Sequence, residues 1–221
     1  MTQAYGYTVP YEQFLPFVTQ YAQDVSEFVA VDAIRNACIE FCERTQILEY
    51  DIPDIDIVAL QSSYVIPTPA DTKVVNILQA YYNTDILLIP KSPDELASIY
   101  RMSNWQTLQG TPQFITRLVK PEVTIVPVPY TNTNDSLRLR VALAPTRDSQ
   151  EIDSEIYEQW AEIIARGARA RIYNHPKQPY FDRAAAAEEA RMFRVGINEA
   201  RIQVAKGLSR DSTQVEFQRL L

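Results

Sequence analysis

Two long apolar stripes in the last third of the sequence constrain the fold more than any other feature. Apolar or small residues recur there at intervals of four and three, a spacing that places them on one face of an α-helix. The first stripe is Ile156, Trp160, Ile163, Gly167 and Ala170, and the second is Ala186, Ala190, Phe193, Ile197, Ala200 and Val204. Only a short link, NHPKQPY, separates the two helices, so they must pack as an antiparallel hairpin.

Residues at the ends of these stripes set the limits of both helices. Asp153 or Ser154 caps the first helix, and the prolines of the link disfavour helical backbone in the residues before them. The second helix opens near Asp182 and ends at Lys206, because a glycine, Gly207, stands in the position favoured just past a helix. Residues 151–206 are therefore predicted to form a helical hairpin.

The N-terminal part of the chain, residues 1–48, is predicted to be helical as well. A short helix is expected from Phe14 to Tyr21, and a longer amphipathic helix after Val29. The apolar face of the longer helix consists of Ile34, Ala37, Cys38, Phe41, Cys42 and Thr45. The stripes at the two ends of the chain have no other partner long enough to cover them, so they should pack together. We expect one buried seam containing Ile34, Phe41, Trp160, Ile163, Phe193 and Ile197.

Residues 49–150 have a different texture, with short β-prone segments separated by prolines. Strands are expected at 54–61, 64–66, 73–82, 86–89, 114–119, 122–126 and 137–143. A short helix capped by Ser92 interrupts them. The predicted fold class is α+β: a helical domain built from both ends of the chain, an inserted antiparallel β domain at 49–150, and a flexible C-terminal tail at 207–221.

The tail is polar, has no helix cap and is too short to remain helical alone in water. It nevertheless carries four apolar residues, Val215, Phe217, Leu220 and Leu221. Two interpretations stay open: a segment that becomes ordered on a partner, or a segment without structure.

The charge distribution argues against a nucleic-acid-binding protein. The net charge is −7, and residues 1–60 alone carry ten acidic and two basic side chains, a local balance of −8. A protein that grips phosphates would show a basic surface instead. The acidic N-terminal region could face a basic partner, line a passage to which DNA must not adhere, or be an ordinary solvated surface.

The sequence contains few of the residues that catalysis or cofactor binding requires. Its five glycines are too scattered for a phosphate-binding loop, and the one histidine, His175, is predicted in a turn. Cys38 and Cys42 are four residues apart on a helix, so they are expected to be reduced and buried rather than metal-bound. We therefore predict no catalytic, cofactor-binding or metal-binding residues, and no enzymatic activity.

Two polar clusters contain residue types that can bind a cation or a nucleic acid. Four acids, Glu49, Asp51, Asp54 and Asp56, could supply oxygen ligands to a cation, but the alternation of Asp54 and Asp56 with isoleucines is typical of the solvated face of a strand. Arg166, Arg169 and Arg171 fan around a helix rather than forming one stripe. This arrangement favours ion pairs with neighbouring helices or subunits over nucleic-acid contact.

No targeting or membrane segment is expected. The opening residues, MTQAYGYTVPYEQF, have neither a basic region nor an unbroken apolar run, and nowhere do 18 apolar residues stand together. We expect a soluble protein that is made in the cytosol.

Several segments together resemble a known family. They are ACIEFCERTQIL, GTPQFI, TIVPVP, IIARGARARIY and HPKQPYFDRAAAAEEARMFRVGINEARIQVAKG, in that order. Their order resembles the head-to-tail adaptor (connector) proteins of tailed bacteriophages, the group that includes the tail tubular protein A of short-tailed phages. The resemblance covers about residues 29–207. Residues 1–28 are longer and richer in tyrosine than the family pattern, which leaves their role open.

The resemblance implies a structural virion protein at the head-to-tail junction, made in the host cytoplasm. Such adaptors form a homo-oligomeric ring, typically of twelve subunits, beneath the portal protein. The ring extends the channel through which genomic DNA passes without sequence-specific binding, and it provides a platform for a tail (nozzle or tube) protein. The resemblance also implies portal contact by the tail residues Val215, Phe217, Leu220 and Leu221. No membrane is involved.

Two other functions remain compatible with the sequence. One is a different phage tail or head completion protein of the same architecture. The other is a virion-associated peptidoglycan hydrolase that uses carboxylate pairs brought together only by folding.

Overall fold

The computed structural model describes residues 7–83, 85–101, 104–117 and 121–206, and the predicted α+β class is confirmed in them. The α-helices are α1 (Leu15–Thr19), α2 (Glu27–Thr45), α3 (Pro93–Tyr100), α4 (Ser154–Tyr173) and α5 (Arg183–Lys206). The 3-10 helices are η1 (Tyr11–Phe14) and η2 (Trp105–Thr107). The strands are β1 (Thr8–Pro10), β2 (Glu49–Asp51), β3 (Ile55–Ile57), β4 (Ser63–Val65), β5 (Thr72–Tyr82), β6 (Ile86–Leu87), β7 (Ile89–Pro90), β8 (Phe114–Thr116), β9 (Glu122–Val126), β10 (Thr133–Pro145) and β11 (Glu151–Asp153).

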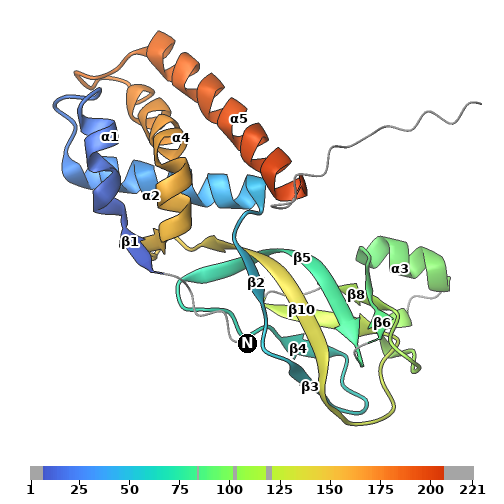
Figure 1. Ribbon diagram of the computed structural model, residues 1–221. Helices are drawn as coiled ribbons and strands as arrows, with labels where there is room; N and C mark the ends of the chain where they lie inside the picture. Colours follow the sequence, from blue (N-terminus) through green and yellow to red (C-terminus); the bar gives the residue numbers. More distant parts are fainter. Residues whose placement is uncertain (1–6, 84, 102–103, 118–120, 207–221) are drawn as a thin grey trace, which may run out of the picture.

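Helices from both ends of the chain form one layer. Figure 1 shows α4 between α1 and α5, and α2 runs across all three. Of the six residues expected in the buried seam, Ile34, Phe41, Trp160, Phe193 and Ile197 lie in one buried cluster, and Ile163 is partly buried against it. The Phe41 ring is central, with its centroid 5.5 Å from that of Trp160 and 6.5 Å from that of Phe193.

The α4–α5 hairpin is antiparallel and very closely packed. A Cβ atom on Gly196 would lie 2.4 Å from Cγ2 of Ile163, and one on Gly167 would lie 2.9 Å from the Phe193 ring. These distances are shorter than a normal van der Waals separation, so only glycine fits at either crossing without a shift of its neighbour. The hairpin therefore depends on glycine at two positions where alanine would otherwise favour the helix.

The β region consists of two sheets with a shared core. One sheet has the strand order β2-β10-β5-β6, with β3 also paired to β10, and the other has the order β4-β9-β8-β7. Side chains from both sheets form a buried cluster that includes Leu88, Ile115, Ile125, Leu137 and Leu143. Among the described strands, every pair is antiparallel except β7 with β8, so the prediction of a purely antiparallel domain was wrong in that pair.

Several predicted strands were wrong in extent. The strand expected at 54–61 ends at Ile57, because Ala59 and Leu60 form a turn in which Leu60 has a φ of 64°. The strand expected at 86–89 is divided: β6 pairs with β5, whereas β7 crosses to the other sheet and pairs with β8. Leu88 marks the change, since its amide donates to Ala80 of β5 and its side chain enters the core.

The N-terminal region, predicted as purely helical, also contains a strand. β1 pairs with β11, immediately before α4, in a two-stranded antiparallel ribbon that matches Val9 to Ile152. The ribbon joins positions more than 140 residues apart in sequence, and the amide of Ser154 donates to the carbonyl of Tyr7 beyond it. Local sequence offered no sign of this pairing, since three residues are too few to show a period.

The helical layer and the β region are joined at two points of the backbone. The chain enters the β region after α2 and leaves it through β10, and the Leu143 amide donates to the Leu48 carbonyl at 2.8 Å. Leu48 packs against both buried clusters. Lys73 of β5 pairs with Glu43 of α2 at 2.6 Å. The two parts thus share side-chain and backbone contacts beside the two connections.

Candidate functional site

The cysteines and acids considered for chemistry have structural surroundings. Cys38 and Cys42 are completely buried, and burial raises the pKa of both thiols, that of Cys42 to about 12. Asp54 pairs with Arg138 at 3.2 Å, and Asp56 accepts a hydrogen bond from the Asp135 amide at 2.8 Å. Within the described ranges, no three His, Cys, Asp or Glu side chains are grouped so that they could hold a metal ion.

The arginines of α4 form ion pairs inside the helical layer. Arg169 is only 5% exposed and donates to both carboxylate oxygens of Glu189 on α5, at 3.0 and 3.1 Å. Its Nη1 donates to the carbonyl of Phe17 at 2.6 Å, and its guanidinium lies 4.4 Å from the centroid of the Tyr21 ring. Arg169 therefore connects α4, α5 and the end of α1.

Arg171 makes the equivalent connection on the other side of α4. It forms an ion pair with Glu40 of α2, and it also donates to the carbonyl oxygens of Gly167 and Asn36. Arg166 pairs with Glu189 at 3.3 Å. All three arginines are thus engaged with carboxylates of the same subunit, and they do not form an outward basic surface.

One end of the helical layer carries exposed acids and aromatics. Glu12, Asp24 and Glu27 are exposed there, and in the described ranges none of the three forms an ion pair. Two aromatic side chains lie among them, Tyr21 at 59% exposure and Phe28 at 83%. We call these five residues the acidic edge. Phe28 thus leaves a large apolar ring in water beside these charges, whereas the Tyr21 ring also contacts the Arg169 guanidinium.

The opposite end of the layer carries exposed arginines. Arg194 and Arg201 are seven residues apart on α5, and neither pairs with an acid in the part of the chain that the structure describes. Val195 and Ile202 accompany them at 39% and 54% exposure. We call these four residues the basic edge. At 3.6 residues per turn, Arg194 and Arg201 lie roughly 150° around the helix from Gly196, which faces α4.

The two edges lie at opposite ends of the row of helices. Figure 1 shows α1 and the start of α2 on one side of α4, and α5 on the other side. The acidic edge belongs to the first group and the basic edge to α5. A surface that is acidic at one end and basic at the other can bind a second copy of itself head to tail, with opposite charges in contact.

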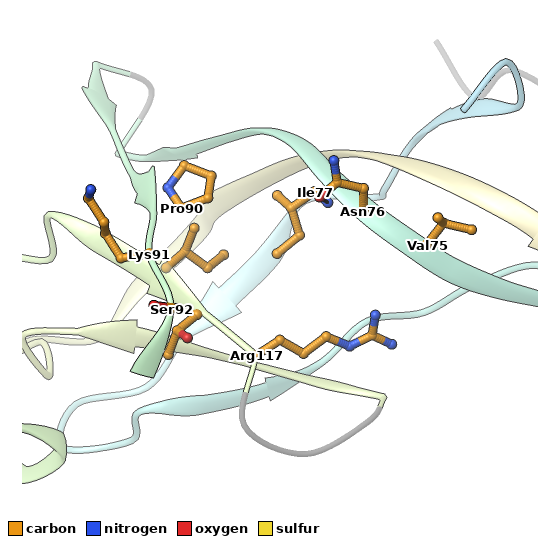
Figure 2. A pocket seen from close by; sticks show the side chains of 9 residues that line it. Val75, Asn76, Ile77, Pro90, Lys91, Ser92 and Arg117 are labelled. Carbon is orange, nitrogen blue, oxygen red and sulfur yellow. Dashed lines mark hydrogen bonds between the residues drawn. The ribbon is translucent and has the colours of Figure 1, made fainter. Parts of the chain in front are cut away.

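A hollow of about 270 Å³ opens between the two sheets of the β region (Figure 2). Val75 and Ile77 of β5, Lys91 at the end of β7, and Ile115 and Arg117 at β8 contribute to its wall. Figure 2 shows the Arg117 side chain extended beneath Val75. Its Nη1 donates to the Val74 carbonyl at 3.0 Å.

Sequence reasoning identified part of these surfaces. It anticipated an acidic N-terminal surface, but not the two edges, because their positions depend on how α1, α4 and α5 are ordered in the layer. It gave no sign of the hollow, whose residues come from three separate strands. The four predicted portal-contact residues, Val215, Phe217, Leu220 and Leu221, lie outside the described residues.

Comparison with known proteins gives one family match. A family model described as SU10 adaptor protein matches residues 11–216, which is most of the chain. A search of curated proteins gives no match. The match includes both charged edges and the hollow. Among the described residues, no helix is long and apolar enough to cross a membrane.

Proposed function

The chain belongs to the SU10 adaptor protein family, and from this membership we propose that it is the head-to-tail adaptor of a tailed bacteriophage, forming a ring beneath the portal. The family is one of structural adaptors, not of enzymes, and it implies contacts with portal and tail proteins. The ring, its twelve subunits, its role in extending the DNA channel and the closer relationship to tail tubular protein A are parts of this proposal.

The observation that carries the proposal is the opposite charge of the two edges. Among the residues that the structure describes, the three carboxylates of the acidic edge and the two guanidinium groups of the basic edge form no ion pair. In a ring every subunit makes the same contact with the next, so each must present two different and complementary surfaces. The helical layer presents such a pair, one at each end.

Apolar and charged residues would contribute differently to this contact. Exposed ion pairs are each worth only about 0.2–1 kcal/mol, so charge alone would not hold a ring together. The rings of Tyr21 and Phe28, facing Val195 and Ile202 of the next subunit, would supply apolar area. The charges would set the orientation, because two acidic edges or two basic edges repel each other.

Charge reversal tests the contact. Variants with Glu12→Lys and Glu27→Lys, or with Arg194→Glu and Arg201→Glu, should fail to form rings on purified portal, as measured by sedimentation. A chain carrying all four changes should regain the ring, because its edges are complementary again with the signs exchanged. The control is Arg147→Glu with Lys177→Glu, two exposed basic residues outside both edges. Normal rings from either two-residue edge variant would show that the subunits meet elsewhere.

The tail is proposed to contact the portal. Its residues 207–221 carry the apolar side chains Val215, Phe217, Leu220 and Leu221 in a polar context. A segment of this kind contributes binding through a few apolar anchors while the rest of it remains solvated. In this proposal the subunit stays monomeric until a portal provides the tail's binding sites and so templates the ring.

A further inference from the structure

We propose that the hollow between the two sheets of the β region is a docking site for an acidic side chain, carried with apolar neighbours on an extended segment of another virion protein. This inference concerns the β region, and it goes beyond the ring and portal contacts proposed above. It rests on the shape of the hollow, on the composition of its walls and on the charge of Arg117.

β5 does not follow a regular ladder where it borders the hollow. Its pairing with β10 shifts register twice, between the partners of Arg140 and Val141 and again between those of Ala142 and Leu143. Such bulges bend a strand and redirect its side chains. Val75 and Ile77 of the bent segment, with Ile115 of β8, form apolar walls. The volume of about 270 Å³ suits one or two side chains rather than a large ligand.

Arg117 brings a charge into this hollow without an acid to balance it. Its Nη1 is bonded to the Val74 carbonyl, but its Nε is buried and has no hydrogen-bond partner in the part of the chain that the structure describes. Burial also lowers the pKa of the guanidinium. A buried N–H group without an acceptor is costly, and a carboxylate beside the guanidinium would reduce that cost by accepting charge-assisted hydrogen bonds.

Three other polar side chains around the hollow, those of Asn76, Lys91 and Ser92, already have hydrogen-bond or ion-pair partners. Lys91 pairs with Glu95 at 2.9 Å. Glu95 also accepts from the Ser92 amide, and its own amide donates to the Ser92 hydroxyl, which completes a capping box at the start of α3. The backbone amides at the start of α3 therefore have acceptors within the capping box. Arg117 is the group around the hollow that can bind a carboxylate from another molecule.

The apolar walls favour a peptide segment over a free anion. A small inorganic anion in the hollow would interact with one guanidinium group, but it would lose part of its hydration shell. The side chains of Val75, Ile77 and Ile115 offer it no hydrogen bonds in exchange. An aspartate or glutamate between aliphatic residues places its carboxylate on Arg117 and its neighbours against these walls. The ion pair and the buried apolar area then both contribute to binding of the segment.

The test uses the full chain with ¹⁵N-labelled arginine. The Nε–H signal of Arg117 is assigned by its absence in Arg117→Lys. The probe is the blocked tripeptide acetyl-Val-Asp-Val-amide, and its matched control is acetyl-Val-Asn-Val-amide. The aspartate peptide should shift the Arg117 signal saturably, and the asparagine peptide should bind about tenfold more weakly, as expected for loss of a charge-assisted bond. Arg147→Gln, which removes an exposed arginine elsewhere, should leave the titration unchanged.

Three results would overturn the proposal. They are the absence of a shift, equal shifts with both peptides, and a shift with inorganic phosphate at the concentration at which the aspartate peptide acts. The last result would indicate a general anion site. Arg117→Gln should also form rings of normal mass on the portal. Failure of the peptide to bind would therefore leave the ring proposal intact, and failure of the ring would leave the peptide result intact.

Discussion

Arg169 and Glu189 form a two-point ion pair inside the α4–α5 hairpin, with nitrogen-to-oxygen distances of 3.0 and 3.1 Å. The same guanidinium donates to the Phe17 carbonyl, so one side chain fixes three segments. Arg169→Ala would leave the Phe17 carbonyl without this donor and the nearly buried Glu189 carboxylate with Arg166 as its remaining partner. We expect the free energy of unfolding to fall by about 2–3 kcal/mol, as measured by urea denaturation.

The comparison for this prediction is Arg191→Ala. Arg191 also pairs with a glutamate, Glu188, at 2.6 Å, but both side chains are more than half exposed. Loss of this exposed ion pair should lower the free energy of unfolding by no more than about 1 kcal/mol. Equal losses in the two variants would mean that the burial of Arg169 has no energetic consequence.

Gly196→Ala should destabilise the protein, although alanine is the better helix former. The new methyl group would lie 2.4 Å from Cγ2 of Ile163, and overpacking of this kind costs about 1–3 kcal/mol. Replacing Ile163 by alanine in the same chain removes the obstructing atoms. The double variant should therefore be more stable than the two separate losses predict, a coupling that denaturant titration of all four chains would measure. Strict additivity would exclude the clash.

The buried thiols should make stability depend on pH in the alkaline range. Burial raises the pKa of Cys42 from 9.0 to about 12, so the folded protein keeps the neutral thiol where the unfolded chain ionises. The stabilising contribution is complete below pH 9 and is lost as the pH rises from 9 to 12. From pH 8 to pH 10 we expect Cys42→Ala to lose about 1 kcal/mol less stability than the parent chain. Identical losses would show that Cys42 titrates normally.

The free protein should not bind duplex DNA better than an uncharged control protein at moderate salt. Its net charge is −7, and twelve copies in a ring would carry −84 (12 × −7). The arginines of α4 are paired with glutamates, which removes them from the surface that DNA would meet. Fluorescence anisotropy with a labelled duplex tests this. Tight binding that weakens steeply with salt would mean that a basic surface has been overlooked.

Deletion of residues 208–221 should separate stability from portal binding. The melting temperature of the free subunit should stay nearly unchanged, because the tail is polar and has neither a helix cap nor a periodic apolar stripe with which to pack. Attachment to portal-bearing heads should be abolished. A truncated protein that completes heads at the normal rate would show that docking uses another surface.

The sequence predicted the helices well because their apolar faces repeat over several turns. The stripes of α2 and α5 each span six positions, a signal that single substitutions hardly disturb, and Asp182 and Gly207 mark the ends expected for α5. The division at Leu88 had no such signal. ILLIP is one apolar run, and only the crossing of two sheets decides that its halves pair with different strands.

The charged edges and the hollow could be predicted only in part. That residues 1–60 are acidic is visible in the sequence, whereas the position of this charge opposite Arg194 and Arg201 requires the order of helices in the layer. Arg117 resembles any arginine at the end of a strand. Its unpaired Nε results from the approach of β5 to β8, a contact between strands more than thirty residues apart.

The inserted position of the β region also sets an order of events on the ribosome. The 108 residues from 46 to 153 separate α2 from α4. At translation rates of about 5–20 residues per second, the apolar face of α2 emerges roughly 5–20 s before the helix that covers it. During that interval the β region, whose strands are contiguous in the chain, can complete its own sheets. The β region can thus fold first, and the helical layer with both charged edges is complete only when α5 has left the exit tunnel.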